Sequence, residues 1–208
     1  MNITVFGANG KVGSLLIHRL LSQGHYIKAF VHGRIPFTVD PRLQIIQGDI
    51  YNADEVAEAT GGSEAVISTL GSWGSARKDI LFTGMKHIVP AMESKGINRI
   101  ISLTGADAWL RNETPDFIHR ISHKALQIGA PKILMDSEKH LELLALSKLD
   151  WTVLRSPIMN ENGDKSFKLS TTRPQPWATI HRNAVVEALM TLFAENSFVK
   201  QSPFITRS

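Results

Sequence analysis

Three glycines spaced three residues apart separate an apolar run from a helix-like segment near the start of the chain, in the stretch TVFGANGKVGSLL (4–16). The run before them has the β-branched and aromatic residues of a strand, and the residues after them place apolar side chains at helical spacing. In such a strand–turn–helix unit, glycines allow a tight turn, a close approach of the backbone to a ligand, and close helix packing. We assign these three roles to Gly7, Gly10 and Gly13, respectively.

The rest of the chain continues the alternation of strands and helices. Strands are predicted over 2–6, 26–31, 43–47, 65–70, 99–104, 151–155 and 203–206, and helices over 11–24, 54–60, 78–95, 132–147 and 182–195. An irregular stretch with helix signals spans 107–131, and a loop-rich stretch that we interpret as functional spans 156–179. Strands such as AVISTL (65–70) are nearly apolar throughout, as is typical of strands covered on both faces.

This pattern predicts an α/β fold with one doubly wound parallel sheet of the Rossmann type. We expect a single NAD(P)-binding domain over 1–208, in which 155–208 adds a small C-terminal cap on the substrate side. A cap this short leaves space for a small-molecule substrate.

The composition excludes several kinds of functional site and disfavours several kinds of partner. The chain has 208 residues and no cysteine, which excludes disulfides, thiolate metal sites and a cysteine nucleophile. Neither a leader segment nor a membrane span is expected from the sequence, and we predict a cytoplasmic protein. The net charge of +4 is scattered, and its densest stretches, SARKD and HRISHK, lack interleaved aromatic residues, so nucleic acid is not an expected partner. A protein partner cannot be identified from these residues.

The glycine turn predicts a dinucleotide, because such turns bring free N–H groups and a helix N-terminus to a pyrophosphate. Asn9, Lys11 and Val12 complete the turn and are further candidates for cofactor binding. A carboxylate that binds the ribose of NAD normally follows the second strand, whereas an NADP site offers arginine to the 2′-phosphate. This chain has His32 and Arg34 there, so we expect NADP(H) in preference to NAD(H).

Six stretches together carry a family resemblance, and they cover nearly the whole chain in order: VFGANGKVG, VHGR, QGDI, AVISTLGS, RIISLTG and LDWTVLRSPIM. They resemble the atypical short-chain dehydrogenase/reductases of the NAD(P)-binding group that includes NmrA-like proteins and biliverdin-reductase-B-like flavin reductases. The resemblance is most specific at the glycine turn and at the LDWTVLR strand. Where the family has arginine at the end of its second strand, this chain has His32, and Arg34 follows two residues later.

The resemblance implies a path for the cofactor along the sheet. The residues that it implicates are Asp49 and Ile50 beside the adenine, Leu70 and Gly71 beside the pyrophosphate, Leu103 and Thr104 near the nicotinamide ribose, and Pro157 and Ile158 at the carboxamide.

The proton donor of many short-chain reductases is absent from this sequence. That donor is a tyrosine with a lysine four residues later, which lowers the pKa of the phenol. Tyr26 and Tyr51 are the two tyrosines, and Phe30 and Glu55 occupy their +4 positions. This disfavours reduction of simple ketones and favours a conjugated acceptor of the flavin or quinone class, which can take its proton from solvent. The alternative is a protein that binds NADP(H) as a redox sensor or regulator without turning it over.

Candidates for a catalytic role are therefore Thr104, His123 and Lys139. Trp73, Trp109 and Trp177 are candidates for stacking an aromatic substrate, although ordinary packing explains each of them as well. His119 and His123 share a helical face, but the motif offers no acidic third ligand, and we predict no metal site.

Overall fold

The computed structural model describes residues 1–162 and 165–208. Its strands are β1 (Asn2–Phe6), β2 (Tyr26–Val31), β3 (Leu43–Gln47), β4 (Ala65–Ser68), β5 (Arg99–Gly105), β6 (Asp150–Ser156), β7 (Ile158–Asn160), β8 (Lys168–Ser170), β9 (Thr179–His181) and β10 (Phe204–Thr206). Its helices are α1 (Lys11–Ser22), α2 (Ala53–Thr60), α3 (Ile80–Ser94), α4 (Phe117–Gly129), α5 (Pro131–Leu146) and α6 (Arg182–Ala194).

Among the described residues, eight strands form one sheet in the order β3-β2-β1-β4-β5-β6-β10-β8. All neighbours in this sheet pair in parallel except β10 and β8, which run antiparallel at one edge. The chain proceeds outward from β1 through β2 to β3 and then returns to the other side of β1 with β4. The gap between the carboxyl ends of β1 and β4 is therefore the point where strand order reverses, and this is where open α/β sheets bind ligands.

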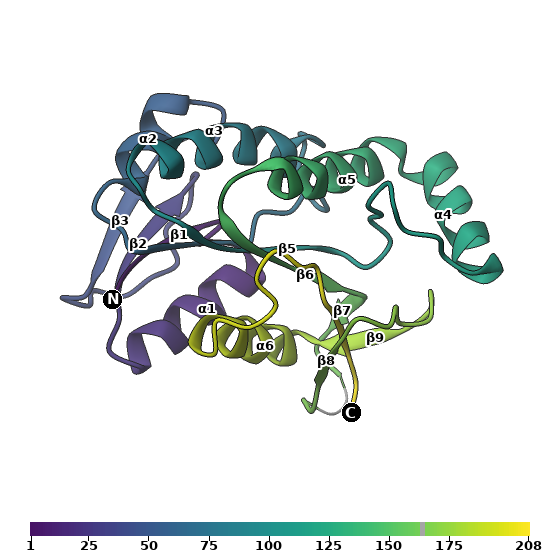
Figure 1. The fold of residues 1–208 in the computed structure, drawn as a ribbon. Helices are drawn as coiled ribbons and strands as arrows, with labels where there is room; N and C mark the ends of the chain where they lie inside the picture. Colours follow the sequence, from purple (N-terminus) through teal and green to yellow (C-terminus); the bar gives the residue numbers. More distant parts are fainter. Residues whose placement is uncertain (163–164) are drawn as a thin grey trace.

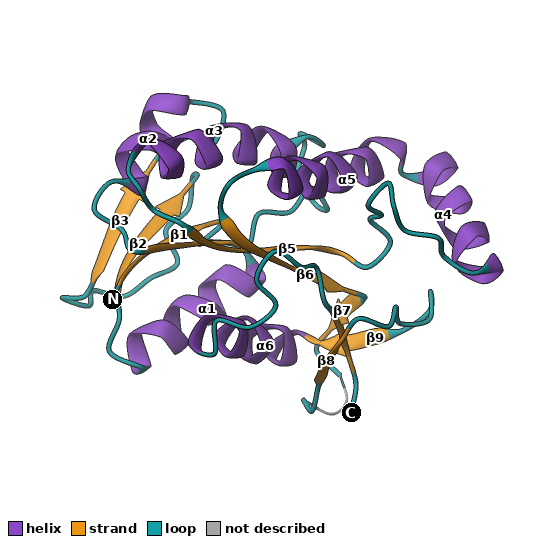
Figure 2. Ribbon diagram, viewed as in Figure 1, coloured by secondary structure: helices purple, strands orange, loops and turns teal. Residues whose placement is uncertain are grey.

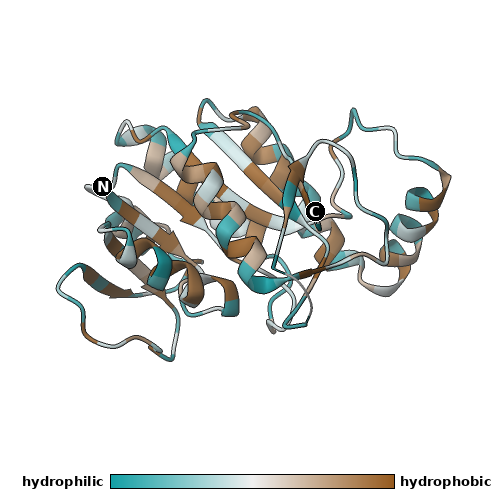
Figure 3. Ribbon diagram, turned by 90° about the horizontal axis from the view of Figure 1, so that it is seen from below, coloured by the Kyte–Doolittle hydropathy of each residue, from teal (hydrophilic) through white to brown (hydrophobic). Residues whose placement is uncertain are grey.

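Helices cover both faces of the sheet, with α1 and α6 on one face and α2, α3 and α5 on the other (Figure 1, Figure 2). The sequence accounts for this because alternate residues of each strand point to opposite faces. In β1, Ile3 and Val5 join the core beneath α1 and α6, and Phe6 joins the core beneath α2, α3 and α5. Figure 3 shows hydrophobic residues concentrated along the inner strands and the facing sides of the helices. The fold is the predicted doubly wound α/β sheet.

The C-terminal residues extend the sheet and add a small separate ladder. Strand β10 lies beside β6, and β7 pairs in parallel with β9 as a second sheet of two strands. Helix α4 lies beyond the end of the main sheet, next to α5 (Figure 1). In the described residues, no helix has the length and apolar character needed to cross a membrane.

Candidate functional site

The glycine turn lies at the carboxyl end of β1, where the structure demands glycine at two positions. Gly7 has a φ of +75°, and a Cβ added there would lie 2.7 Å from the backbone carbon of Thr69. A Cβ on Gly13 would lie 2.2 Å from the backbone oxygen of Gly7. Gly13 thus lets α1 pack directly on the turn, as the sequence predicted.

Helix α1 begins at a glycine that provides no side-chain cap for its first turn. Gly10 is its N-cap and offers no side-chain hydrogen bond, and the first turn contains no acidic residue. Lys11 is exposed at the first helical position, whereas Val12 is buried in the core. Free N–H groups, the helix dipole and a lysine are arranged to attract an anion at this end of α1.

Asn9 connects the glycine turn to the turn that follows β2. Its side-chain amide donates to the backbone oxygen of His32 over 2.7 Å and to that of Arg34 over 3.3 Å. From the other side, the amide of Gln47 donates to the backbone oxygen of Gly33 over 3.2 Å. These bonds hold the 32–34 turn by its carbonyl groups and leave the side chains of His32 and Arg34 exposed.

Asp40, the next acidic residue along the chain, is occupied by a neighbouring cation. Its carboxylate accepts hydrogen bonds from the backbone and side chain of Arg42, and these lower the pKa of Asp40. A carboxylate held in this way has less capacity left for ribose hydroxyls.

Further along the carboxyl edge, two of the residues expected beside the adenine and pyrophosphate, Ile50 and Leu70, meet at α3. The side chains of Ile50 and Leu70 both approach Gly84, where an added Cβ would lie 2.7 Å from Leu70 Cδ1 and 3.1 Å from Ile50 Cγ1. Asp49 accepts a hydrogen bond of 3.0 Å from the backbone of Tyr51. Gly71 is exposed, and nothing lies within 4 Å of the position of its absent Cβ.

Thr104 lies near the end of β5, beside Arg155 of β6 in the sheet register. Its hydroxyl is buried, and within 1–162 and 165–208 it has no hydrogen-bond partner. A buried polar atom without a hydrogen-bond partner costs free energy. Such an atom indicates that a ligand or a water molecule forms the missing hydrogen bond. Together with the glycine cradle, this hydroxyl fits a dinucleotide lying along the carboxyl ends of the strands. Leu103 is buried in the core, Pro157 follows β6, and Ile158 is exposed.

The two other catalytic candidates lie in different surroundings. His123 of α4 is buried, shares a 2.7 Å hydrogen bond with Glu138 of α5, and stacks on Trp109 with 3.7 Å between ring centroids. Lys139 is exposed on α5, and its ammonium lies 5.5 Å from the centre of the Phe82 ring. Within the described part of the chain, neither residue forms a hydrogen bond with the Thr104 hydroxyl. These contacts join α4 to α5 through the His123 side chain.

The three candidate tryptophans differ in exposure. Trp109 is half-buried against His123. Trp73 and Trp177 are 70% and 66% exposed. Trp177 lines a groove of about 300 Å³ with Pro157, and its indole is therefore available to a ligand there.

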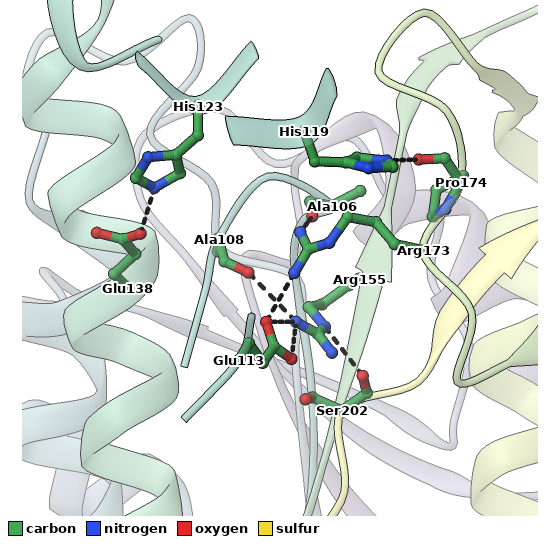
Figure 4. A network of polar contacts seen from close by, with 10 residues as sticks. All are labelled: Ala106, Ala108, Glu113, His119, His123, Glu138, Arg155, Arg173, Pro174 and Ser202. Atoms are coloured by element: carbon green, nitrogen blue, oxygen red, sulfur yellow. Dashed lines mark hydrogen bonds and ion pairs between the residues drawn. The ribbon is translucent and has the colours of Figure 1, made fainter. Parts of the chain in front are cut away.

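Sequence reasoning missed an ionic cluster beyond the ends of β5 and β6 (Figure 4). Glu113 accepts from Arg155 at 2.6 Å and from Arg173 at 2.6 Å, and Arg173 also donates to the backbone oxygen of Ala106. Burial lowers the pKa of Arg155 to about 10, and Glu113 opposes that shift. The arginine within WTVLRS, an otherwise uncharged stretch of a buried strand, signals that some counter-charge is needed, but it does not identify Glu113.

His119 joins α4 to the 171–178 segment by contacts separate from the Glu113 ion pairs. One ring nitrogen lies 2.9 Å from the backbone oxygen of Pro174, and the other lies 2.6 Å from the Asp116 carboxylate. His119 and His123 thus contact different partners, and the described residues contain no group of three or more side chains that could hold a metal ion.

Known proteins resemble this chain in sequence and in fold. A family model described as NAD(P)H-binding matches residues 7–196. A 2-alkyl-3-oxoalkanoate reductase of Stenotrophomonas maltophilia is 27% identical over 138 residues, which are 64% of this chain and 39% of that protein. A protein of the same name from Shewanella oneidensis is 26% identical over 170 residues, 73% of this chain and 43% of that protein. The chain therefore spans less than half the length of these relatives.

Solved structures share the whole fold at low identity. A short-chain dehydrogenase/reductase of Veillonella parvula in complex with NADP has a TM-score of 0.78 and 22% identity, covering 99% of this chain and 94% of that one. ChuY, described as an anaerobilin reductase from Escherichia coli O157:H7, has a TM-score of 0.76 and 18% identity, covering 100% and 97%. The chain belongs to the family described as NAD(P)H-binding, and it shares its fold with solved short-chain dehydrogenase/reductases.

Proposed function

We propose that the protein is an NADPH-dependent reductase of a small conjugated acceptor of the flavin or quinone class. When bound, the dinucleotide supplies a hydride to the acceptor. The chain's own residues hold the pyrophosphate at the glycine turn and α1, and they offer the Thr104 hydroxyl to the nicotinamide end. Asp49, Ile50, Leu70, Gly71, Leu103, Pro157 and Ile158 remain the residues proposed to border the cofactor.

The observation that carries this proposal is the position of both tyrosines. Tyr26 is exposed at the start of β2, at the opposite edge of the sheet from the glycine turn. Tyr51 donates its hydroxyl to Asp79 over 2.5 Å, and burial, with Asp79 adding to the effect, raises the pKa of Tyr51 to about 12. Neither phenol is suited to protonate a substrate, which favours an acceptor that spreads the incoming charge over a ring system and takes its proton from solvent.

NADPH is the proposed cofactor because the exposed side chains of His32 and Arg34 follow β2, and the next acidic residue along the chain, Asp40, is held by Arg42. A guanidinium can form a charge-assisted fork on the 2′-phosphate. The NADP complex of the Veillonella parvula protein supports this choice by analogy of fold.

Oxidation of NADPH and NADH with FMN, riboflavin and naphthoquinones tests the proposal directly. We expect turnover with at least one acceptor, and a higher kcat/KM with NADPH than with NADH. Thr104→Val should lower kcat/KM while leaving the fold intact, because it replaces a hydroxyl with a methyl group of the same shape. Tight NADPH binding with no turnover of any acceptor would instead support the redox sensor.

A further inference from the structure

A groove at the end of β6 has the chemistry of a binding site. Three chain segments form it: Pro157 after β6, Trp177 to Thr179 at the start of β9, and Thr206 with Arg207 at the end of β10. Strands β6 and β10 run in parallel, so their carboxyl ends open at the same edge of the sheet as the glycine turn. The groove of about 300 Å³ therefore extends the cofactor edge past β6.

The wall of this groove offers a flat apolar surface. The indole of Trp177 is 66% exposed, and Pro157 and Ala178 add further apolar surface beside it. An exposed indole in a groove is suited to stacking on a planar ring. Such a contact contributes more free energy than the burial of its apolar area alone.

The rim of the groove carries the guanidinium of Arg207, which has no ion-pair partner among the residues that the structure describes. Arg207 donates one hydrogen bond of 3.1 Å to the Thr179 hydroxyl, and it takes part in no ion pair among residues 1–162 and 165–208. Two described carboxylates on other segments after β5 have partners of their own, since Glu161 pairs with Arg182 and Glu113 pairs with Arg155. The Thr206 hydroxyl, which also belongs to the groove lining, is buried and has no partner in the described part of the chain.

We propose that this groove is the acceptor site and that Arg207 binds an anionic substituent, a phosphate or a carboxylate, on the conjugated ring that Trp177 stacks. This inference rests on the proposed function and adds the substrate class, an anionic ring compound. A guanidinium forms two parallel hydrogen bonds with either anion, and its Thr179 contact holds it in place for them. Pro157 belongs both to the groove and to the residues proposed at the nicotinamide, so the two ligands would meet there.

FMN and riboflavin test the proposal because they share one ring system and differ by a phosphate. We expect wild type to bind FMN more tightly than riboflavin, as measured by quenching of flavin fluorescence with and without NADP⁺. Arg207→Gln keeps a donor for Thr179 but removes the charge, and it should raise the Kd for FMN roughly tenfold or more while changing that for riboflavin less than about twofold.

Lys148→Gln is the matched control, because it also removes one exposed positive charge but precedes β6 at the opposite edge of the sheet. Lys148→Gln should leave the Kd values for FMN and riboflavin unchanged. Trp177→Leu should weaken FMN and riboflavin by the same factor, since both stack the same ring. Arg207→Gln should also leave the Kd for NADPH unchanged.

These outcomes separate the failure of this inference from the failure of the proposed function, because binding is read without turnover. Equal losses for both flavins in Arg207→Gln, or no loss for either, would overturn the anion-binding role. The same comparison with 1,4-naphthoquinone and its 2-sulfonate covers the quinone class. Failure of wild type to bind either pair would overturn the groove as the acceptor site, whatever the affinity for NADPH.

Discussion

The side-chain amide of Asn9 donates a 2.7 Å hydrogen bond to the backbone oxygen of His32, which ties the glycine turn to the turn after β2. Asn9→Ala removes this bond and should reduce the affinity for NADPH by about 0.5–1.5 kcal/mol, the usual net value of one hydrogen bond. The affinity for NADH should fall less, because the loss acts through the position of Arg34. Calorimetric titration of both cofactors measures the difference. Equal losses would mean that Asn9 contacts the pyrophosphate itself.

Arg34→Ala should weaken NADPH binding by roughly 1.5–3 kcal/mol, the size of a charge-assisted hydrogen bond, and hardly change NADH binding. Titration of both cofactors against wild type and variant provides the measurement. If the preference for NADPH survives in Arg34→Ala and disappears in His32→Ala, then His32 binds the phosphate. His32 occupies the position at which the family named above has arginine.

Gly13→Ala should abolish dinucleotide binding and lower the melting temperature. The new methyl group would lie 2.2 Å from the Gly7 backbone oxygen, and a backbone atom can move away only by distorting the turn. Gly129→Ala at the end of α4 is the control, since nothing lies within 4 Å of its added Cβ. Thermal unfolding with and without NADPH should separate the two variants clearly, and similar behaviour would contradict the steric argument.

Glu113→Gln should destabilise the protein by about 3–5 kcal/mol, because it leaves buried Arg155 and partly buried Arg173 without their counter-charge. Glu142→Gln breaks an ion pair with Arg111, whose side chain is 88% exposed, and should cost less than about 1 kcal/mol. Urea unfolding of the two variants gives both values. A small loss in both would mean that the Glu113 cluster is far more hydrated than its burial indicates.

Stability should fall in acid through His140. This residue is fully buried and shares a 2.8 Å hydrogen bond with Ser102, and burial lowers its pKa to about 3. The unfolded chain takes up this proton near the ordinary histidine pKa of about 6.5, so the unfolded state binds more protons between the two values. Stability is therefore fully present above pH 6.5 and decreases below it, by about 1.4 kcal/mol per pH unit for one proton.

His140→Gln can keep the bond to Ser102 but does not titrate, so its free energy of unfolding should depend less steeply on pH between about 6 and 4. Urea unfolding at several pH values compares the two slopes. Burial raises the pKa values of Asp107 and Asp136, and their contributions have the opposite sign but are common to both proteins. Identical slopes would refute the assignment to His140.

The sequence predicted the regular part of the fold closely, because each of those elements carries its own signal. Strand β2 lies over the predicted 26–31, and α6 begins at the predicted residue 182 with its apolar stripe buried. The three-residue strands β7 and β8 fall in the stretch predicted as loop. Strands so short have no measurable period of hydrophobic residues. Their pairing depends on partners distant in the sequence, as when Ile158 of β7 pairs with Thr179 of β9.

The candidate site likewise contains features that a local sequence pattern predicts and features that it does not. Glycine positions follow from steric rules that act within a few residues, and the turn has the geometry that those rules imply. The pairing of Glu113 with Arg155 and Arg173 joins three segments far apart in the chain, so no local pattern reveals it. The cofactor and acceptor roles of individual residues remain predictions that the variants above can test.

The order of the strands separates the two halves of the proposed site along the chain. The residues proposed for the phosphates and the adenine lie on β1 to β4 and the turns after them, whereas every residue that lines the groove comes at or after Pro157. Substitutions in the last quarter of the chain can therefore change which acceptor is bound without altering the glycine turn or the 32–34 turn. A sheet arranged in this way lets the range of acceptors diverge during evolution while the dinucleotide half is preserved.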